Sequence, residues 1–186
     1  MGSRSRFGDR TPNLKQMRVL TTSEAREWAR LSGWTFRTPE IPPSRKSRPA
    51  KSFLLPCDSG HKSALSRLVA STFCESGGGL FWITEHGIWP SSEVPWLFDA
   101  YRQTLGEATP LTNAPAHVIG HTEQDAFMGL LALSLYFIWG SIVLQPKGHV
   151  MLYFSHDEWL DIFGEDQSDL EGLVRDLEAF GLKEIQ

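Results

Sequence analysis

The feature that most restricts the fold is an apolar stretch that holds no charged residue from Ala126 to Pro146. Its first part, 126–144, is long and apolar enough for a single helix to cross a bilayer. Such a stretch either enters a membrane or forms the centre of a globular core, and the two outcomes give different proteins. Membrane association of 126–144 is therefore the first alternative to weigh.

Local signals within and after this stretch favour a buried helix followed by a β-hairpin. Gly140 and Ser141 interrupt the apolar run, and the sequence Gln-Pro-Lys-Gly at 145–148 is typical of a turn. Strand-like residues lie on both sides of that turn. We therefore expect a central apolar helix at about 123–139 and a hairpin at about 141–154.

The other segments alternate between helical periodicity and short strand-like runs. Capping residues, apolar stripes and terminal glycines predict further helices at 22–32, 59–73, 93–105, 155–163 and 168–180. β-Branched and aromatic runs predict further strands at 34–36, 53–55, 80–84, 88–89 and 117–119. Clustered strands with separate helices favour the α+β class. We predict a single domain with a small, mostly antiparallel or mixed sheet packed by helices.

Composition divides the chain of 186 residues into four regions. Region 1–16 is typical of a disordered arm or a cloning remnant, and 17–36 carries the first helix and a short strand. Region 37–51 is a basic, proline-rich linker or loop. The α+β body, 52–186, ends in acidic helices. A chain of this length suits one domain.

The net charge of −4 conceals a strong asymmetry along the chain. Residues 1–51 hold 12 Lys and Arg against 4 Asp and Glu, whereas residues 52–186 hold 6 against 18. The segment 155–186 alone holds 10 acidic residues. A body with this balance repels nucleic acid and attracts basic surfaces at long range. Two alternatives stay open: the acids could only hydrate exposed helices, and the basic residues of 37–51 could bind nucleic-acid phosphates.

These charges predict a non-catalytic, acidic protein-binding module that steers a basic partner with its C-terminal helices. Tryptophan is frequent at the centres of interfaces, and Trp89 and Trp159 are the candidate anchors among seven tryptophans. The candidate steering charges are Asp161, Glu165, Asp166, Asp169 and Glu171.

The main alternative is an enzyme that uses a pair of histidines. His117 and His121 are four residues apart, and Glu123 follows closely, so the three side chains could ligate a metal. No HExxH pattern or other catalytic signature accompanies them. We therefore predict no catalytic residue, no metal and no cofactor, and keep this set as the alternative.

The sequence Ser155-His156-Asp157-Glu158 contains the residue types of a catalytic triad without its geometry. Neighbouring residues of one element point in different directions, whereas a triad must converge in space. The spacing Ser-x-x-Glu also matches a capping box at the start of a helix. We interpret it as the cap of the helix expected at 155–163.

The two cysteines, Cys57 and Cys74, match no zinc or redox motif. Two buried thiols in a reducing cytoplasm are the simpler interpretation, and a disulfide is the alternative. The arginine-rich N-terminus lacks the apolar region of a signal peptide, so we expect a cytoplasmic protein.

The acidic, tryptophan-rich body is similar in composition to bacterial immunity proteins, which neutralise toxins. The similarity involves no shared motif. It implies a bacterial protein that works by binding another protein.

Overall fold

In the computed structural model, the described residues are 18–34, 50–89, 93–146, 150–164 and 167–185. They form the predicted α+β fold, with five helices and one sheet of seven strands. In chain order the elements are β1 (Arg18–Leu20), α1 (Thr22–Leu31), β2 (Ala50–Leu54), α2 (Ser59–Glu75), β3 (Gly79–Glu85), α3 (Pro95–Thr104), β4 (Ala116–Ile119), α4 (Gln124–Tyr136), β5 (Gly140–Leu144), β6 (Val150–Phe154), β7 (Trp159–Gly164) and α5 (Gln167–Phe180).

The sheet has the strand order β1-β4-β3-β5-β6-β7-β2, and every neighbouring pair is antiparallel. The predicted hairpin is confirmed as β5 and β6, with Ser141 opposite Phe154. At the β2 edge, the backbone of the C-terminal segment continues the pairing. The Ile185 N–H donates to the Ser52 carbonyl at 2.8 Å, and the Leu54 N–H donates to the Lys183 carbonyl at 3.1 Å. This short pairing covers part of an edge that would otherwise be open to other strands.

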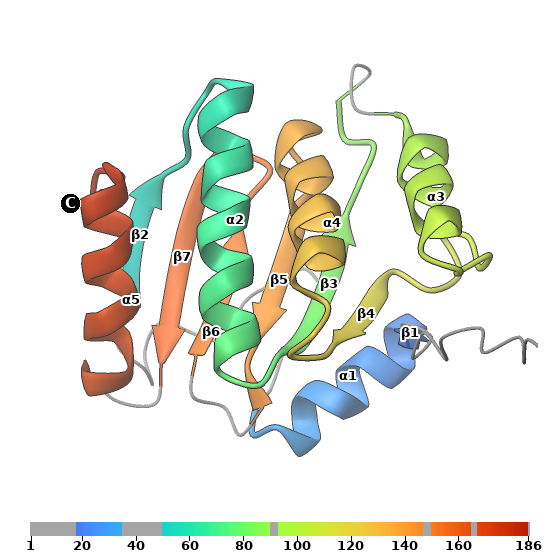
Figure 1. The fold of residues 1–186 in the computed structure, drawn as a ribbon, viewed down its shortest axis with the longest axis horizontal. Helices are drawn as coiled ribbons and strands as arrows, with labels where there is room; N and C mark the ends of the chain where they lie inside the picture. The colour runs from blue at the N-terminus through green and yellow to red at the C-terminus, as the bar shows by residue number, and fades with distance from the viewer. Residues whose placement is uncertain (1–17, 35–49, 90–92, 147–149, 165–166, 186) are drawn as a thin grey trace, which may run out of the picture.

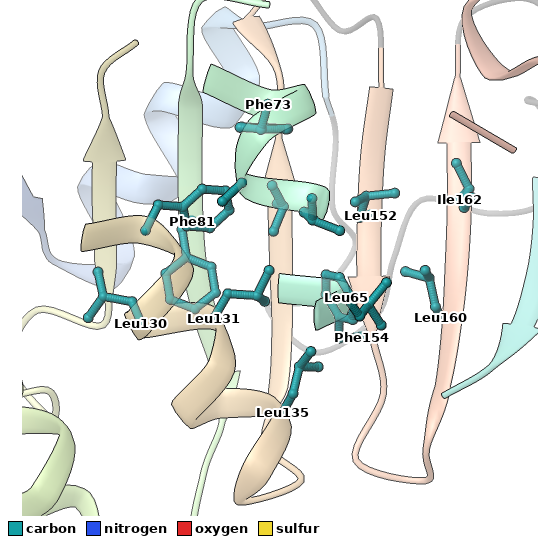
Figure 2. Packing of buried hydrophobic residues seen from close by; sticks show 14 of the residues in the cluster. Leu65, Phe73, Phe81, Leu130, Leu131, Leu135, Leu152, Phe154, Leu160 and Ile162 are labelled. Atoms are coloured by element: carbon teal, nitrogen blue, oxygen red, sulfur yellow. The ribbon is translucent and has the colours of Figure 1, made fainter. Parts of the chain in front are cut away.

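Helices α2 and α4 lie side by side across one face of the sheet, with α5 over the β7–β2 side and α3 beside α4 (Figure 1). We call this the helix-covered face. Its core combines side chains of α2, α4, β3, β6 and β7, and Figure 2 shows several of them, including Phe73, Leu131, Phe81 and Phe154. All four are almost completely buried, so most of the hydrophobic stabilisation arises between these layers.

The second face of the sheet packs against α1. Ala25 and Ala29 of α1 are fully buried, and their small side chains allow the helix to approach Leu80 and Trp82 of β3. A capping box begins the helix that the sequence predicts at 22–32: the Glu24 N–H donates to Thr21 Oγ1, and the Thr21 N–H donates to a Glu24 carboxylate oxygen at 2.8 Å.

The predicted central helix is confirmed as α4, although it is shorter than expected. It begins after Glu123, and Thr122 is not its cap. The Glu123 carboxylate instead accepts a hydrogen bond from the Gly120 N–H at 2.6 Å. Among the described residues, no helix combines the length and the apolar character that a membrane span requires.

The helix expected at 155–163 is wrong, because residues Trp159–Gly164 form strand β7. Ser155 does not cap a helix: its hydroxyl accepts from the Asp157 N–H at 3.1 Å inside a tight turn, where Glu158 has φ 66°. Leu160 and Ile162 then enter the core, so the apolar residues have the period of a strand.

Smaller differences concern local features. Residues 88–89 form no strand, and of the strand expected at 34–36 only Trp34 lies among the described residues, outside any strand. Ser92, the expected cap of α3, and most of the basic segment 37–51 also lie outside the described residues. Cys57 is exposed and Cys74 is buried, and both are free thiols, so the disulfide alternative is not observed.

Replacing Gly129 with alanine tests how closely α3 packs on α4. An added Cβ would lie 2.1 Å from the hydroxyl oxygen of Tyr101 and 2.4 Å from ring carbon Cζ, so the ring would have to move off α4. We expect Gly129→Ala to lower the free energy of unfolding by about 1–3 kcal/mol in urea denaturation, which is the usual cost of overpacking.

Gly172 in α5 provides the control, because no atom lies within 4 Å of the added Cβ. Gly172→Ala should raise the free energy of unfolding by up to about 1 kcal/mol through helix propensity. Equal effects of the two substitutions would contradict the packing argument.

Candidate functional site

Several chain segments that are distant in sequence meet at one end of the sheet, at the top of Figure 1. The antiparallel order brings the end of β3, the start of β5 and the turn between β6 and β7 to this end. The last turn of α4 and the first turn of α3 lie there as well (Figure 1). A partner could therefore contact several elements at once.

Exposed apolar side chains gather at this end. Among the described residues, eight large hydrophobic side chains are exposed, and six of them lie at this end, with exposed fractions from 38% to 65%. Leu54 ends β2 at the edge of the sheet, and the other five, on the loop after β3, on α3 and at the end of α4, are Ile88, Trp89, Trp96, Leu97 and Tyr136. Together with the carboxylates of Glu85, Glu93, Asp157 and Glu158, we call these five the strand-end surface. Exposed apolar residues gathered on neighbouring elements mark interaction surfaces more often than singly scattered ones do.

Aromatic rings in edge-on and tilted contact connect this surface to the core. The Tyr136 ring centroid lies 5.3 Å from that of Phe137, and the Phe137 centroid lies 5.4 Å from that of Trp139. Trp139 is buried, and its ring centroid also lies 5.8 Å from that of His86 and 5.6 Å from that of Phe98. Trp139 thus joins the loop after β3, the start of α3 and the end of α4. Such packing preorganises the exposed residues and reduces the entropy lost on binding.

The carboxylates of the strand-end surface come from three segments. Asp157 and Glu158 lie in the β6–β7 turn with about half of each side chain exposed. Glu93 is exposed near Gly87, before α3. Lys62 Nζ lies 3.4 Å from a Glu158 oxygen, but the Lys62 side chain is buried. Acidic side chains therefore dominate the exposed charge in the described part of this end.

A β-bulge positions Glu85. The register between β3 and β5 shifts between Ile83 and Glu85, which places Glu85 opposite Gly140. Because side chains alternate along a strand, the extra residue turns Glu85 to the sheet face that carries Tyr153. A Cβ at Gly140 would lie 2.7 Å from Glu85 Oε2, so only glycine leaves room for this carboxylate. Glu85 Oε2 there lies 2.7 Å from His156 Nδ1.

The pKa of Tyr153 reflects the negative charge at this end. Burial raises the pKa of the Tyr153 phenol most, and the charges of Glu85, Asp161 and Asp157 raise it further. The Ser155 hydrogen bond has the opposite effect. Three carboxylates from β3, β7 and the turn therefore act on one buried hydroxyl.

A second unusual feature lies beneath the surface, between α3 and β4. Arg102 and His117 are fully buried, and none of their side-chain nitrogens has a hydrogen-bond partner. Burial lowers the pKa of the Arg102 guanidinium, while the nearby carboxylates Glu107 and Asp99 oppose that shift. The closest approach is 3.9 Å, between Arg102 Nη1 and Asp99 Oδ1. The pKa of His117 falls to about 3 because of burial first and the Arg102 charge second.

The metal alternative gains no support from the structure. His117 points into the core against the rings of Phe81 and Phe98. His121 is exposed beyond the end of β4, and the Glu123 carboxylate bonds to Gly120. Within the described part of the chain, no group of three or more His, Cys, Asp or Glu side chains could hold a metal ion.

The structure separates the predicted binding residues. Trp89 belongs to the strand-end surface, and Trp159 is half-buried at the start of β7 at the same end. Asp161 is 4% exposed and accepts a hydrogen bond from the Ser52 hydroxyl, so it does not contribute to an exposed surface. Glu171 is exposed in the first half of α5, a helix that begins at the opposite end of the sheet (Figure 1). Glu165, Asp166 and the side chain of Asp169 lie outside the described part of the structure.

Sequence reasoning missed Trp96, Tyr136 and Glu85. Trp89 and Trp96 are seven residues apart, which hinted at a common role. That both are exposed, however, depends on how α3 packs against the rest of the fold. One charge signal was available: between Arg67 and Arg175 the sequence holds 14 Asp and Glu, with Arg102 and Lys147 as the sole basic residues. Arg102 is buried, and Lys147 lies outside the described residues.

Comparisons with protein-family models, curated proteins and solved structures find no match for this chain.

The buried imidazole of His117 predicts a specific loss of stability in acid. His117 is neutral in the native protein down to about pH 3, whereas the unfolded chain gains this proton near the ordinary pKa of 6.5. The stability that the neutral, buried His117 contributes is therefore fully present above pH 6.5 and is lost as the pH falls towards 3. Below pH 6.5, the free energy of unfolding of the native chain should fall as the pH is lowered. In His117→Leu this fall should be smaller by about 1.4 kcal/mol per pH unit, measured by urea denaturation.

His121→Leu is the matched control, since His121 is exposed. It should leave the pH profile of stability unchanged. A His117→Leu protein with the same acid-dependent decline as the native chain would show that this imidazole is not buried in its neutral form.

Proposed function

We propose that this chain is a non-catalytic protein-binding module that docks a basic partner at the strand-end surface. One observation carries the proposal: five of the eight exposed large hydrophobic side chains in the described structure lie on the loop after β3, on α3 and at the end of α4. Two of them are tryptophans and one is a tyrosine. Trp and Tyr supply a large share of the binding energy at measured interfaces.

The charge of the partner follows from the carboxylates around the apolar residues. Glu93, Asp157 and Glu158 are exposed or half-exposed at this end. Opposite charges on a partner would accelerate encounter and fix its orientation, while the aromatic residues would slow dissociation. Arginine fits both features, because its guanidinium pairs with carboxylates and stacks on indole rings.

This proposal moves the predicted docking region from the C-terminal helix to the loop after β3 and the start of α3. The acids of the β6–β7 turn belong to the segment 155–186 singled out by composition, so part of the original argument is retained. The compositional similarity to immunity proteins agrees with a role in binding a basic protein.

A displayed library of random peptides, selected on the folded protein, tests the proposal without a known partner. We expect the selected peptides to be enriched in Arg or Lys together with apolar residues. The best peptide should bind Trp89→Ala and Trp96→Ala at least about tenfold more weakly than the native chain in calorimetric titration, as for truncated hot-spot residues. Its association rate should fall steeply as salt rises towards about 1 M, where the Debye length is about 3 Å.

Leu31→Ala is the control for a general effect of apolar exposure. Leu31 is 72% exposed on α1, away from the strand-end surface, and its loss should leave binding unchanged. The proposal fails if the selected peptides show no excess of basic residues. It fails equally if they bind the tryptophan variants as tightly as the native protein.

A further inference from the structure

His156 sits between two carboxylates of the strand-end surface. Its Nδ1 lies 2.7 Å from Glu85 Oε2 at the end of β3, and its Nε2 lies 3.6 Å from Asp157 Oδ2 in the β6–β7 turn. About a quarter of each of the His156 and Glu85 side chains is exposed, so both remain in contact with solvent. The imidazole therefore joins two separate segments of the proposed docking surface.

The two ring nitrogens of His156 differ in their hydrogen bonding. A neutral imidazole carries one N–H, and the 2.7 Å contact assigns it to Nδ1, which donates to Glu85. Nε2 then presents a lone pair towards the Asp157 carboxylate at 3.6 Å, which is no hydrogen bond. A proton on Nε2 turns this contact into a charge-assisted hydrogen bond. Protonation therefore adds a bond within the turn and offsets one negative charge of the surface.

The other charged groups near His156 come from each neighbouring element. Glu85 and His86 lie on β3, Tyr153 on β6, Asp161 on β7, and Asp157 and Glu158 in the turn, with Glu158 paired to Lys62 of α2. The raised pKa of Tyr153 keeps this phenol neutral at physiological pH. Histidine ordinarily changes charge between about pH 5 and 8, where carboxylates and lysine keep theirs. His156 and His86 are the histidines among these groups.

We propose that His156 makes the strand-end surface a pH-sensitive docking site, which holds its basic partner more weakly when the imidazole is protonated. This inference rests on the proposed function. The protonated imidazole keeps its bond to Glu85, adds one to Asp157 and places a positive charge between them, so a basic side chain of the partner must compete with it for both carboxylates. Binding of the partner and binding of the proton are then linked, and each weakens the other by the same factor.

The test uses the best peptide from the library selection, chosen to contain Arg or Lys and no His, Asp or Glu. Its dissociation constant is measured by calorimetry at about pH 7.5 and at about pH 5.5. For the native chain we expect binding to weaken by about threefold to tenfold at the lower pH, the range typical of coupling between two sites.

Two substitutions of His156 predict opposite outcomes. Glutamine can still donate a hydrogen bond to Glu85 but does not titrate, so His156→Gln should bind tightly at both pH values. Arginine carries a permanent charge, so His156→Arg should bind weakly at both. His61→Gln is the control, because His61 contacts Asp58 at the start of α2 and should leave the pH dependence of binding unchanged.

The outcomes separate the two proposals. Tight, pH-independent binding by the native chain would overturn the role of His156 and leave the proposed function standing. A pH dependence that persists in His156→Gln would also overturn it, because a group other than His156 would then carry the dependence. Absence of peptide binding at both pH values would overturn the proposed function, and this inference with it.

Discussion

The pairing of β3 with β5 is the constraint on which the rest of the molecule depends. It sets Phe81 opposite Val143 at the centre of the sheet, and the rings of Phe127 and Phe73 from α4 and α2 extend the contacts of Phe81. The same pairing contains the bulge that turns Glu85 towards His156. The core and the candidate site are thus consequences of one strand register.

The buried pair of Arg102 and His117 shows that the interior beneath the site is not optimised for stability alone. A guanidinium without hydrogen-bond partners in the core is costly, and Asp99 and Glu107 offset part of that cost through their charges. Asp99 also accepts a hydrogen bond from the Leu111 N–H at 2.7 Å, which fastens the loop before β4 to α3. The charges around Arg102 therefore hold α3, and with it Trp96, in a defined position.

Local sequence rules predicted what local interactions decide. The capping box at Thr21 and Glu24, the apolar helix α4 and the β5–β6 hairpin follow from neighbouring residues alone. The same rules failed at Ser155, where a capping signal predicted a helix although Leu160 and Ile162 alternate as in a strand. The strand β7 forms there because it pairs with β6 and β2, which are distant in sequence or not visible to a local rule. The site was only partly predictable for the same reason. The loop that carries Trp89 and the end of α4 that carries Tyr136 reach the same end of the molecule only because of the order of the strands.

The location of the docking surface is the central claim, and NMR mapping tests it most directly. Addition of the selected basic peptide to the isotopically labelled protein should shift the amide signals of residues 85–89, 93–97, Tyr136 and the β6–β7 turn. Such a result would place the partner on the strand-end surface. Shifts confined to α5 around Glu171, with the loop after β3 unaffected, would contradict the account and return the docking site to the acidic C-terminal helix.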